Sequence, residues 1–253
     1  MKEIIINRSN NFRVILGLAV PHPRPHLIFL YNGKRTTFNT IYDLNCLLFE
    51  NFINMIKKSF IKIGPGIFSI HLGIFQSKES PHFHAHYCIP IDRYVDLITD
   101  HTKNLKFYQG LREWPIRLAN EGLKWKKHDL KLLHQDKKIH TYFSKLPNLS
   151  RNFSVKFHSS QPRIAFIPNK HGPHHNSIKD LVLVMMEFSK HYKLNDSKHG
   201  GCHLCIQHEL SIDSEFNDVQ GYLQVDIVNY YRINPYRKKW LKLFEQEPYV
   251  VIT

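Results

Sequence analysis

The chain has 253 residues, 42% of them hydrophobic, so it can bury one large core or two of ordinary size. No apolar run approaches the roughly 18–20 residues that cross a bilayer, and the N-terminus lacks the cleavage site of a signal peptide. Four cysteines are too few and too irregularly spaced for a disulfide framework, so we expect a protein of a reducing compartment, cytoplasmic or nuclear.

The formal net charge is +14, and +13 of it lies in residues 1–160. Such a basic field attracts polyanions, although a solvated basic surface would give the same composition. We therefore expect a nucleotide or a nucleotide conjugate as the partner, keep a nucleic-acid end as an alternative, and expect no membrane partner.

The first 75 residues predict a strand, a turn, a strand, a helix and a strand. Thr40-Ile-Tyr-Asp43 has the S/T-x-x-D form of a helix N-terminus, apolar residues then recur at helical spacing, and Gly64-Pro-Gly66 ends the helix. In chain order we expect a strand over 12–18, a proline-rich turn at 21–25, a strand from His26, a helix from 41 through 56, and a strand over 67–75.

The segment from 82 to 87 alternates strictly between histidine and an apolar residue, which is the signature of a strand. His82, His84 and His86 therefore share one face. Same-face neighbours lie about 6.6–7 Å apart and a zinc–imidazole bond is about 2 Å, so one metal cannot bind all three histidines without a bend. Two histidines could hold a metal with a third ligand from elsewhere. Alternatively, a central His84 could act as a nucleophile, or the strand could simply carry surface histidines.

The run H-F-H-A-H-Y-C followed by Ile-Pro at 82–90 resembles the histidine-triad (HIT) signature of a superfamily of nucleotidyl hydrolases and transferases. Upstream, P-H-L-I-F-L at 25–30 resembles the strand that delivers a fourth histidine, here His26. The resemblance implies that His84 attacks an α-phosphorus, that a nucleotidyl-histidine forms, and that water releases a nucleoside monophosphate. It implies supporting roles for His82, His86 and His26, and it requires no cofactor and no metal.

The match to the family is incomplete around the substrate. The Ser or Thr that usually precedes the first triad histidine by three residues is Glu79, and the acidic residue that commonly binds the ribose is Leu18. His71 stands where the family usually has Asn. The identity of the base and the sugar therefore cannot be carried over. The candidate substrate-binding residues are Gln76, Ser77, Ser80 and His71.

Residues 101–150 are basic and contain several aromatic residues. Pro115 interrupts the helical pattern and predicts two helices, near 101–113 and 125–142. Aromatic residues beside lysines, such as Trp125, could stack on bases. The simpler interpretation is that the aromatic residues form the buried seam of amphipathic helices.

A shift of 137 positions superimposes residues 25–50 on 162–187 with seven identities, and turn, cap and apolar positions recur together, as in a duplicated unit. I-P-N-K-H at 167–171 also resembles a stretch of HIT proteins. The second copy predicts a helix over 178–192, a strand over 202–207, and a counterpart of the triad strand at 221–229, which has no histidine.

We therefore predict an α+β protein of two HIT-like units, each an antiparallel sheet with packed helices, arranged as an intramolecular pseudo-dimer within a monomer. The expected divisions are a catalytic unit at 1–100, a basic helical connector at 101–150 and a degenerate unit at 151–253. The expected function is that of a nucleotidyl hydrolase or transferase. The alternatives are a non-catalytic nucleotide or nucleic-acid binding module and a metal-dependent hydrolase that uses the histidine row.

Overall fold

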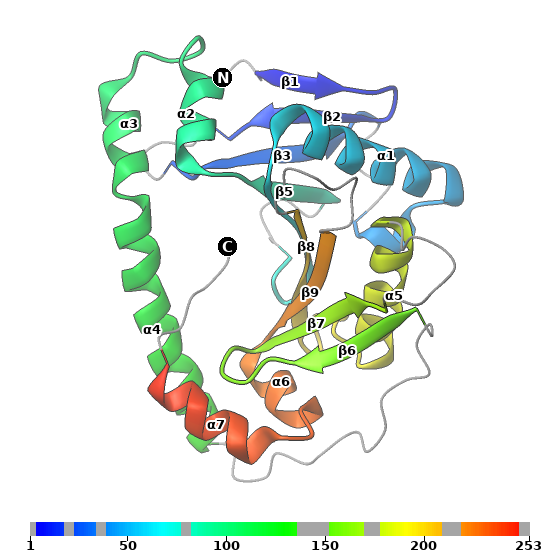
Figure 1. Ribbon diagram of the computed structural model, residues 1–253, viewed down its shortest axis with the longest axis vertical. Helices are drawn as coiled ribbons and strands as arrows, with labels where there is room; N and C mark the ends of the chain where they lie inside the picture. The colour runs from blue at the N-terminus through cyan, green and yellow to red at the C-terminus, as the bar shows by residue number, and fades with distance from the viewer. Residues whose placement is uncertain are drawn as a thin grey trace.

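The computed structural model describes residues 4–17, 23–33, 39–76, 82–135, 152–169, 178–208 and 219–247. Within these residues the chain is an α+β protein with one nine-stranded antiparallel sheet and seven α-helices (Figure 1). The strands are β1 (Ile5–Arg8), β2 (Phe12–Leu16), β3 (His26–Tyr31), β4 (Gly66–Gly73), β5 (His84–Cys88), β6 (Phe153–Phe157), β7 (Arg163–Pro168), β8 (Gly201–His208) and β9 (Val219–Val225). The helices are α1 (Cys46–Ile63), α2 (Ile91–Ile98), α3 (Leu105–Arg112), α4 (Trp114–Gln135), α5 (Ile178–His191), α6 (Ile227–Ile233) and α7 (Arg237–Gln246).

The strand order is β1-β2-β3-β5-β4-β8-β9-β7-β6. At its centre β4 pairs with β8 from Gly66 opposite His208 to Gly73 opposite Gly201. Read outward from this pair, β4, β5, β3 and β2 follow the same order as β8, β9, β7 and β6. We call β1–β5 the N-terminal side of the sheet and β6–β9 its C-terminal side.

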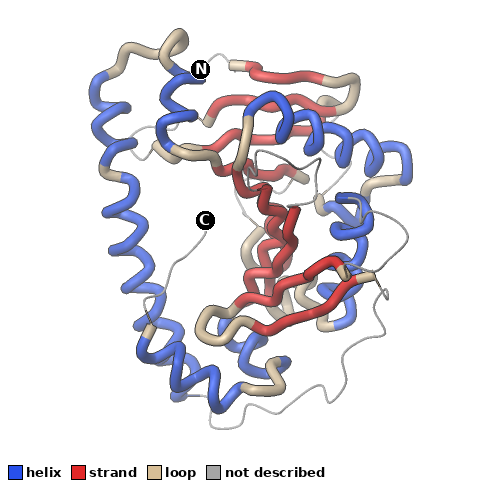
Figure 2. Tube along the Cα trace, in the orientation of Figure 1, coloured by secondary structure: helices blue, strands red, loops and turns tan. Residues whose placement is uncertain are grey.

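Helices cover both faces of this strongly twisted sheet (Figure 2). α1 and α5 pack on one face, and the long α4 runs along the opposite side (Figure 1). The face under α1 and α5 holds large buried side chains, among them Phe29, Phe68, Tyr87 and Phe166, and Phe188 of α5 packs on Phe166. Because side chains alternate along a strand, the histidines of β5 are left on the other face.

The helix expected from residue 41 begins later than the sequence pattern predicts. The capping box of Thr40 and Asp43 closes only a 3-10 turn over Ile41–Asp43, with the Thr40 amide donating to the Asp43 carboxylate at 2.8 Å. Asn45 is the true N-cap of α1, since its side chain accepts from the amide of Leu48 at 2.9 Å. The helix ends as predicted at Gly64, whose φ of +105° suits a residue without a Cβ.

The helices of the connector also begin at other residues than the sequence predicts. α3 occupies part of the expected range 101–113, but α4 starts at Trp114 rather than near 125. Pro115 is the second residue of α4, where a missing amide hydrogen costs no helical hydrogen bond. The expected end of this helix at 142 lies outside the described residues. α2 was not predicted.

The C-terminal side matches the expected elements more closely. α5 and β8 confirm the helix expected over 178–192 and the strand expected over 202–207. The strand expected over 221–229 is present as β9, but it ends at Val225, so the predicted range is wrong in its last residues. Asp226 caps α6 there by accepting from the amide of Asn229 at 3.0 Å.

A buried tyrosine makes the same contact on each side of the sheet. The Tyr94 hydroxyl donates to the carbonyl of Gly17, and the Tyr230 hydroxyl donates to the carbonyl of His158, each at 2.8 Å. Tyr94 lies six residues after the end of β5, and Tyr230 lies five residues after the end of β9. Each bond therefore ties a helix, α2 or α6, to the end of a neighbouring strand.

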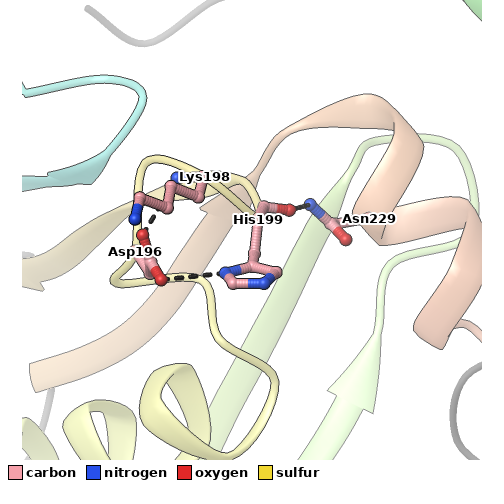
Figure 3. Close-up of polar contacts among 4 residues, drawn as sticks. All are labelled: Asp196, Lys198, His199 and Asn229. Carbon is pink, nitrogen blue, oxygen red and sulfur yellow. Dashed lines mark hydrogen bonds and ion pairs between the residues drawn. The ribbon is translucent and has the colours of Figure 1, made fainter.

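The turn before β8 is held by a small network of side chains (Figure 3). Asp196 accepts from the backbone amide of Lys198 at 2.9 Å and lies 2.8 Å from Nδ1 of His199. The side-chain amide of Asn229 donates to the carbonyl of His199 at 2.7 Å. These contacts fix the entry of the chain into β8 against the start of α6.

The turn before β4 has the same construction. Nε of Arg93, in α2, donates to the carbonyl of Ile63 at 2.9 Å. In both turns the next residue is a glycine with positive φ, Gly64 at +105° and Gly200 at +152°. None of the helices in the described part of the chain combines the length and apolar character needed to cross a membrane.

Candidate active site

The histidine face is built on β5, which lies between β3 and β4. Ala85 and Tyr87 are fully buried on the α1 face, whereas His84 and His86 are partly buried on the other. The predicted alternation is therefore confirmed for these two histidines. β3 pairs with β5 so that His26 stands opposite Cys88, one strand away from His86.

His84 is held in one orientation by the backbone. Its Nδ1 lies 2.8 Å from the carbonyl oxygen of His82. Because a carbonyl can only accept, Nδ1 carries the proton in this contact and Nε2 of the neutral ring keeps a lone pair. The sequence interpretation placed His82 on the strand, but β5 begins at His84, so His82 precedes it. His82 thus contributes its carbonyl to the site.

His86 is the centre of a cluster of imidazoles. Its ring centroid lies 4.8 Å from that of His71, 5.1 Å from that of His84 and 5.2 Å from that of His26. His71, on β4, is stacked in turn on His203 of β8 at 4.3 Å. The structure thus brings together His26, His84, His86 and the predicted substrate-binding residue His71.

Burial keeps most of this cluster uncharged. Desolvation is the main cause that lowers the pKa of His26 to about 4 and that of His86 to about 2, and it also lowers the pKa of His71. Neighbouring histidines and Arg24 lower the pKa of His86 and His71 further. At pH 7 these rings are neutral, so each can donate one hydrogen bond and accept another.

Arg24 supplies the positive charge of the site. Its charge is among the causes that lower the pKa values of His26, His71 and His86, which places it near all three rings. Its guanidinium lies 5.5 Å from the centroid of the Trp114 ring at the start of α4. The sequence analysis assigned this residue only to a turn, although its position two residues before His26 was a usable signal.

The other predicted substrate-binding residues are not part of this cluster as described. The Gln76 side-chain amide donates to the carbonyl of Asn39 at 2.5 Å, which ties the end of β4 to the segment before α1. Ser77 and Ser80 lie outside the described residues. The sequence analysis missed His203. Only the pairing of β8 with β4, which sets His203 opposite His71, brings it to the site.

A cavity of about 390 Å³ adjoins the histidine cluster. His71 and His203 form the wall that it shares with the cluster, and Arg24 lies at the same boundary. The remaining walls come from the end of β4, from α4, and from β9 with the start of α6. They are Ile74, Phe75, Trp125, His128, Asp129, Leu132, Gln224, Val225, Asp226, Ile227 and Val228.

The cysteines do not join this chemistry. Cys202 and Cys205 are fully buried in β8, and burial raises the pKa of both thiols, that of Cys205 to about 11. Both are therefore buried, protonated thiols, whereas Cys46 is exposed. Within the described ranges, no three His, Cys, Asp or Glu side chains are grouped as a metal site would require.

Comparison with known proteins gives matches in structure alone. No protein-family model and no curated protein sequence matches the chain. A GALT-like protein from Arabidopsis thaliana is 12% identical with a TM-score of 0.45, over 99% of this chain and 89% of that one. A uridylyltransferase mutant is 9% identical with a TM-score of 0.37, over 87% of this chain and 77% of that one.

Proposed function

We propose that the protein hydrolyses or transfers a nucleotidyl group through a covalent bond between His84 and the α-phosphorus of its substrate. The contact between Nδ1 of His84 and the carbonyl of His82, at 2.8 Å, carries this proposal. It fixes the tautomer in which Nε2 is unprotonated and nucleophilic without a separate base. The surrounding neutral histidines and Arg24 supply the groups that such a reaction needs.

In the first step Nε2 of His84 attacks the α-phosphorus. A phosphorus–nitrogen bond forms, the bond from phosphorus to the leaving group breaks, and the leaving group takes its electron pair. The charge on the phosphoryl oxygens would be stabilised by the guanidinium of Arg24 and by N–H groups of the neighbouring histidine rings. The ring N–H of His86 can donate a hydrogen bond to the leaving group, but burial lowers the pKa of His86 to about 2 and keeps this ring neutral. We therefore assign the proton that the leaving group takes up to His82 or to solvent.

In the second step a water molecule or another acceptor attacks the same phosphorus. The phosphorus–nitrogen bond breaks, and the electron pair returns to Nε2 of His84. With water, the products are a nucleoside monophosphate and a proton, which the histidine cluster can pass to solvent. With another nucleotide or phosphate as acceptor, the same intermediate would complete a transfer.

We also propose that the chain consists of two HIT-like units, at 1–100 and 151–253, joined by the connector at 101–150. The support is the mirrored strand order about β4 and β8 and the matching contacts of Tyr94 and Tyr230. In this arrangement the two units pair through their sheets as an intramolecular pseudo-dimer, and the chain acts as a monomer.

The second unit would lack the nucleophile. The 137-residue shift equates Ile28 of β3 with Ala165 of β7, and Tyr222 stands opposite Ala165 as His86 stands opposite Ile28. Tyr222 thus occupies the position of His86. Two residues earlier, Gln220 occupies the position of His84.

The test is to trap the intermediate. We would incubate the full chain with dinucleoside polyphosphates, capped RNA, adenylated DNA and nucleoside phosphoramidates labelled in the α-phosphate, and quench during turnover. We expect an acid-labile label on the wild-type protein and none on His84→Ala, with nucleotide binding by this variant retained within about tenfold.

His101→Ala is the matched control, because His101 is an exposed histidine of the same region. It should label and turn over like the wild type. Undiminished turnover in His84→Ala would refute the mechanism. Nucleotide binding without turnover of any substrate would favour the non-catalytic binding module, and activity that requires an added metal would favour the metal-dependent hydrolase.

A further inference from the structure

The cavity beside the histidine cluster has one conspicuous wall residue. Trp125 of α4 lines it, yet 48% of this side chain is exposed. The buried side of the same helix is formed by other residues, such as Leu133, which is only 8% exposed. Packing of α4 therefore does not account for the position of Trp125, and the interpretation of this aromatic residue as part of a buried seam is wrong.

α4 holds Trp125 at a fixed place. The next residue, Lys126, donates from Nζ to the carbonyls of Glu245, at 3.0 Å, and Glu247 at the end of α7. Farther along, α4 also packs against α6. The indole is thus presented by an anchored helix, which lowers the conformational entropy lost when a ligand stacks on it.

The end of the cavity nearest β4 is polar and reaches the reaction site. Nε2 of His71 is buried and has no hydrogen-bond partner among the residues that the structure describes. His203 is fixed between His71 and Phe75, whose ring centroids lie 4.3 and 4.6 Å from its own. Arg24 lines the same end and carries a full positive charge.

The opposite end of the cavity is mostly apolar. Leu132, Val225 and Ile227 line this part of the cavity with Trp125, and Asp129, only 7% exposed, adds a carboxylate to the wall. Such a wall suits a flat heterocycle whose amino or ring N–H groups can donate to a carboxylate. A volume of about 390 Å³ falls within the size class of small-ligand sites, so it suits one nucleoside rather than a strand.

We propose that this cavity binds the nucleobase of the substrate, stacked on Trp125, with the phosphate directed past Arg24 and His71 toward His84. The inference rests on the proposed function for the identity of the substrate. It assigns base recognition to α4 and to the C-terminal side of the sheet, while the reacting histidines belong to the N-terminal side. The basic connector thereby contributes an aromatic platform for a single base.

The first experiment measures binding to the full chain by calorimetry, with nucleoside monophosphates and ribose 5-phosphate as probes. Loss of base–aromatic stacking in Trp125→Ala should weaken nucleotide binding about tenfold or more. Trp125→Phe should stay within about threefold of the wild type. Ribose 5-phosphate, which has no base, should bind Trp125→Ala as it binds the wild type.

Leu123→Ala is the matched control, since Leu123 lies on the same helix, is 57% exposed and does not line the cavity. It should bind nucleotides like the wild type. Equal nucleotide affinities for Trp125→Ala and Leu123→Ala would overturn the assignment. An equal loss for ribose 5-phosphate would also overturn it, because the tryptophan would then not act through the base.

A second measurement separates this inference from the proposed function. His84→Ala should bind nucleoside monophosphates within about tenfold of the wild type and should lose this affinity when combined with Trp125→Ala. If no substrate is turned over but Trp125→Ala still selectively weakens nucleotide binding, the mechanism fails and the base site stands. If a short RNA binds at least 100-fold more tightly than its component nucleotides, a site for one base is refuted.

Discussion

The two sides of the sheet share their strand order, yet the side chains that their paired strands carry on the histidine face differ. On the N-terminal side, His26 and His86 face each other across β3 and β5 with ring centroids 5.2 Å apart. At the corresponding place on the C-terminal side, the guanidinium of Arg163 lies 5.2 Å from the ring of Tyr222 and donates to Gln224 at 2.7 Å. A pair of neutral, titratable rings is replaced by a cation that is stacked and hydrogen-bonded.

This difference separates the contacts that hold the sheet together from the side chains to which we assign the reaction. The contacts that recur on both sides lie at strand ends and turns and use buried hydroxyls and backbone carbonyls. The side chains that differ project from the middle of the strands on one face. The scaffold can therefore be kept while the chemistry of one face is changed, and the following predictions test this separation.

The largest effect is expected from exchanging residues between the two sides. His84→Gln gives β5 the residue that β9 has at Gln220, and it removes the proposed nucleophile, so turnover should fall at least about 10³-fold. The reciprocal change Gln220→His should leave the rate unaltered, because Gln220 is exposed and lacks the surrounding imidazoles. Steady-state rates with the best substrate are the measurement. Activity gained by Gln220→His in the His84→Gln background would show that the two sides are chemically equivalent.

Separating the two sides should disrupt assembly. A fragment of residues 1–100 exposes the edge of β4 that β8 normally covers over its full length. Unpaired edge strands promote self-association, so we expect the fragment to dimerise or aggregate in sedimentation velocity while the whole chain remains monomeric. A stable monomeric fragment with full activity would mean that the C-terminal side is dispensable.

The free energy of unfolding should fall in acid because of two buried histidines on the N-terminal side. Burial lowers the folded-state pKa of His26 to about 4 and of His86 to about 2, below the unfolded value near 6.5. The unfolded chain therefore binds protons first, and the stabilisation present above pH 6.5 is lost as the pH falls. At pH 5 the loss is about 2 kcal/mol for each histidine.

Urea unfolding between pH 5 and 7.5 would measure this dependence. The double variant His26→Gln with His86→Gln should flatten it, whereas His101→Gln, at an exposed site, should not. If the double variant keeps the slope of the wild type, these histidines are not the groups that titrate.

The smallest expected effect is a loss of stability that is equal on the two sides of the sheet. Tyr94→Phe and Tyr230→Phe each remove one buried hydrogen bond of the same length, so each should lower the free energy of unfolding by about 1–2 kcal/mol. Equilibrium unfolding in urea, compared with a substitution of the exposed Tyr236, provides the measurement. Losses that differ by more than about 2 kcal/mol would show that the two contacts are not equivalent.

Periodicity in the sequence predicts the strands, the main helices and the histidine face well, because alternation and helical spacing are local properties. It fails where two local signals compete. Both Thr40 and Asn45 are good N-caps, and only the packing of α1 on the sheet selects Asn45. Pro115 could end a helix or sit in its first turn, and Asp226 caps a helix within a segment that alternates like a strand.

The candidate site is predicted only where strand alternation or the family resemblance marks its residues. His84, His86 and His26 follow from alternation and resemblance, and His71 follows from its place before the triad. His203 reaches the site through the pairing of β8 with β4, more than 130 positions away in the sequence. No local pattern contains that information. Trp125 lies in α4, a helix that begins earlier in the chain than the sequence pattern predicts.

The central pairing of β4 with β8 within one chain also bears on the number of reaction centres in the molecule. A dimer of identical chains joined at such a pair must carry every substitution twice, so its two reaction centres stay equal. Within one chain of two units, as we propose, each unit can change independently, and the proposed nucleophile His84 corresponds to Gln220 in the second unit. The stoichiometry of covalent loading should accordingly be one nucleotide for each chain of 30.0 kDa, and intact-protein mass spectrometry can read it directly.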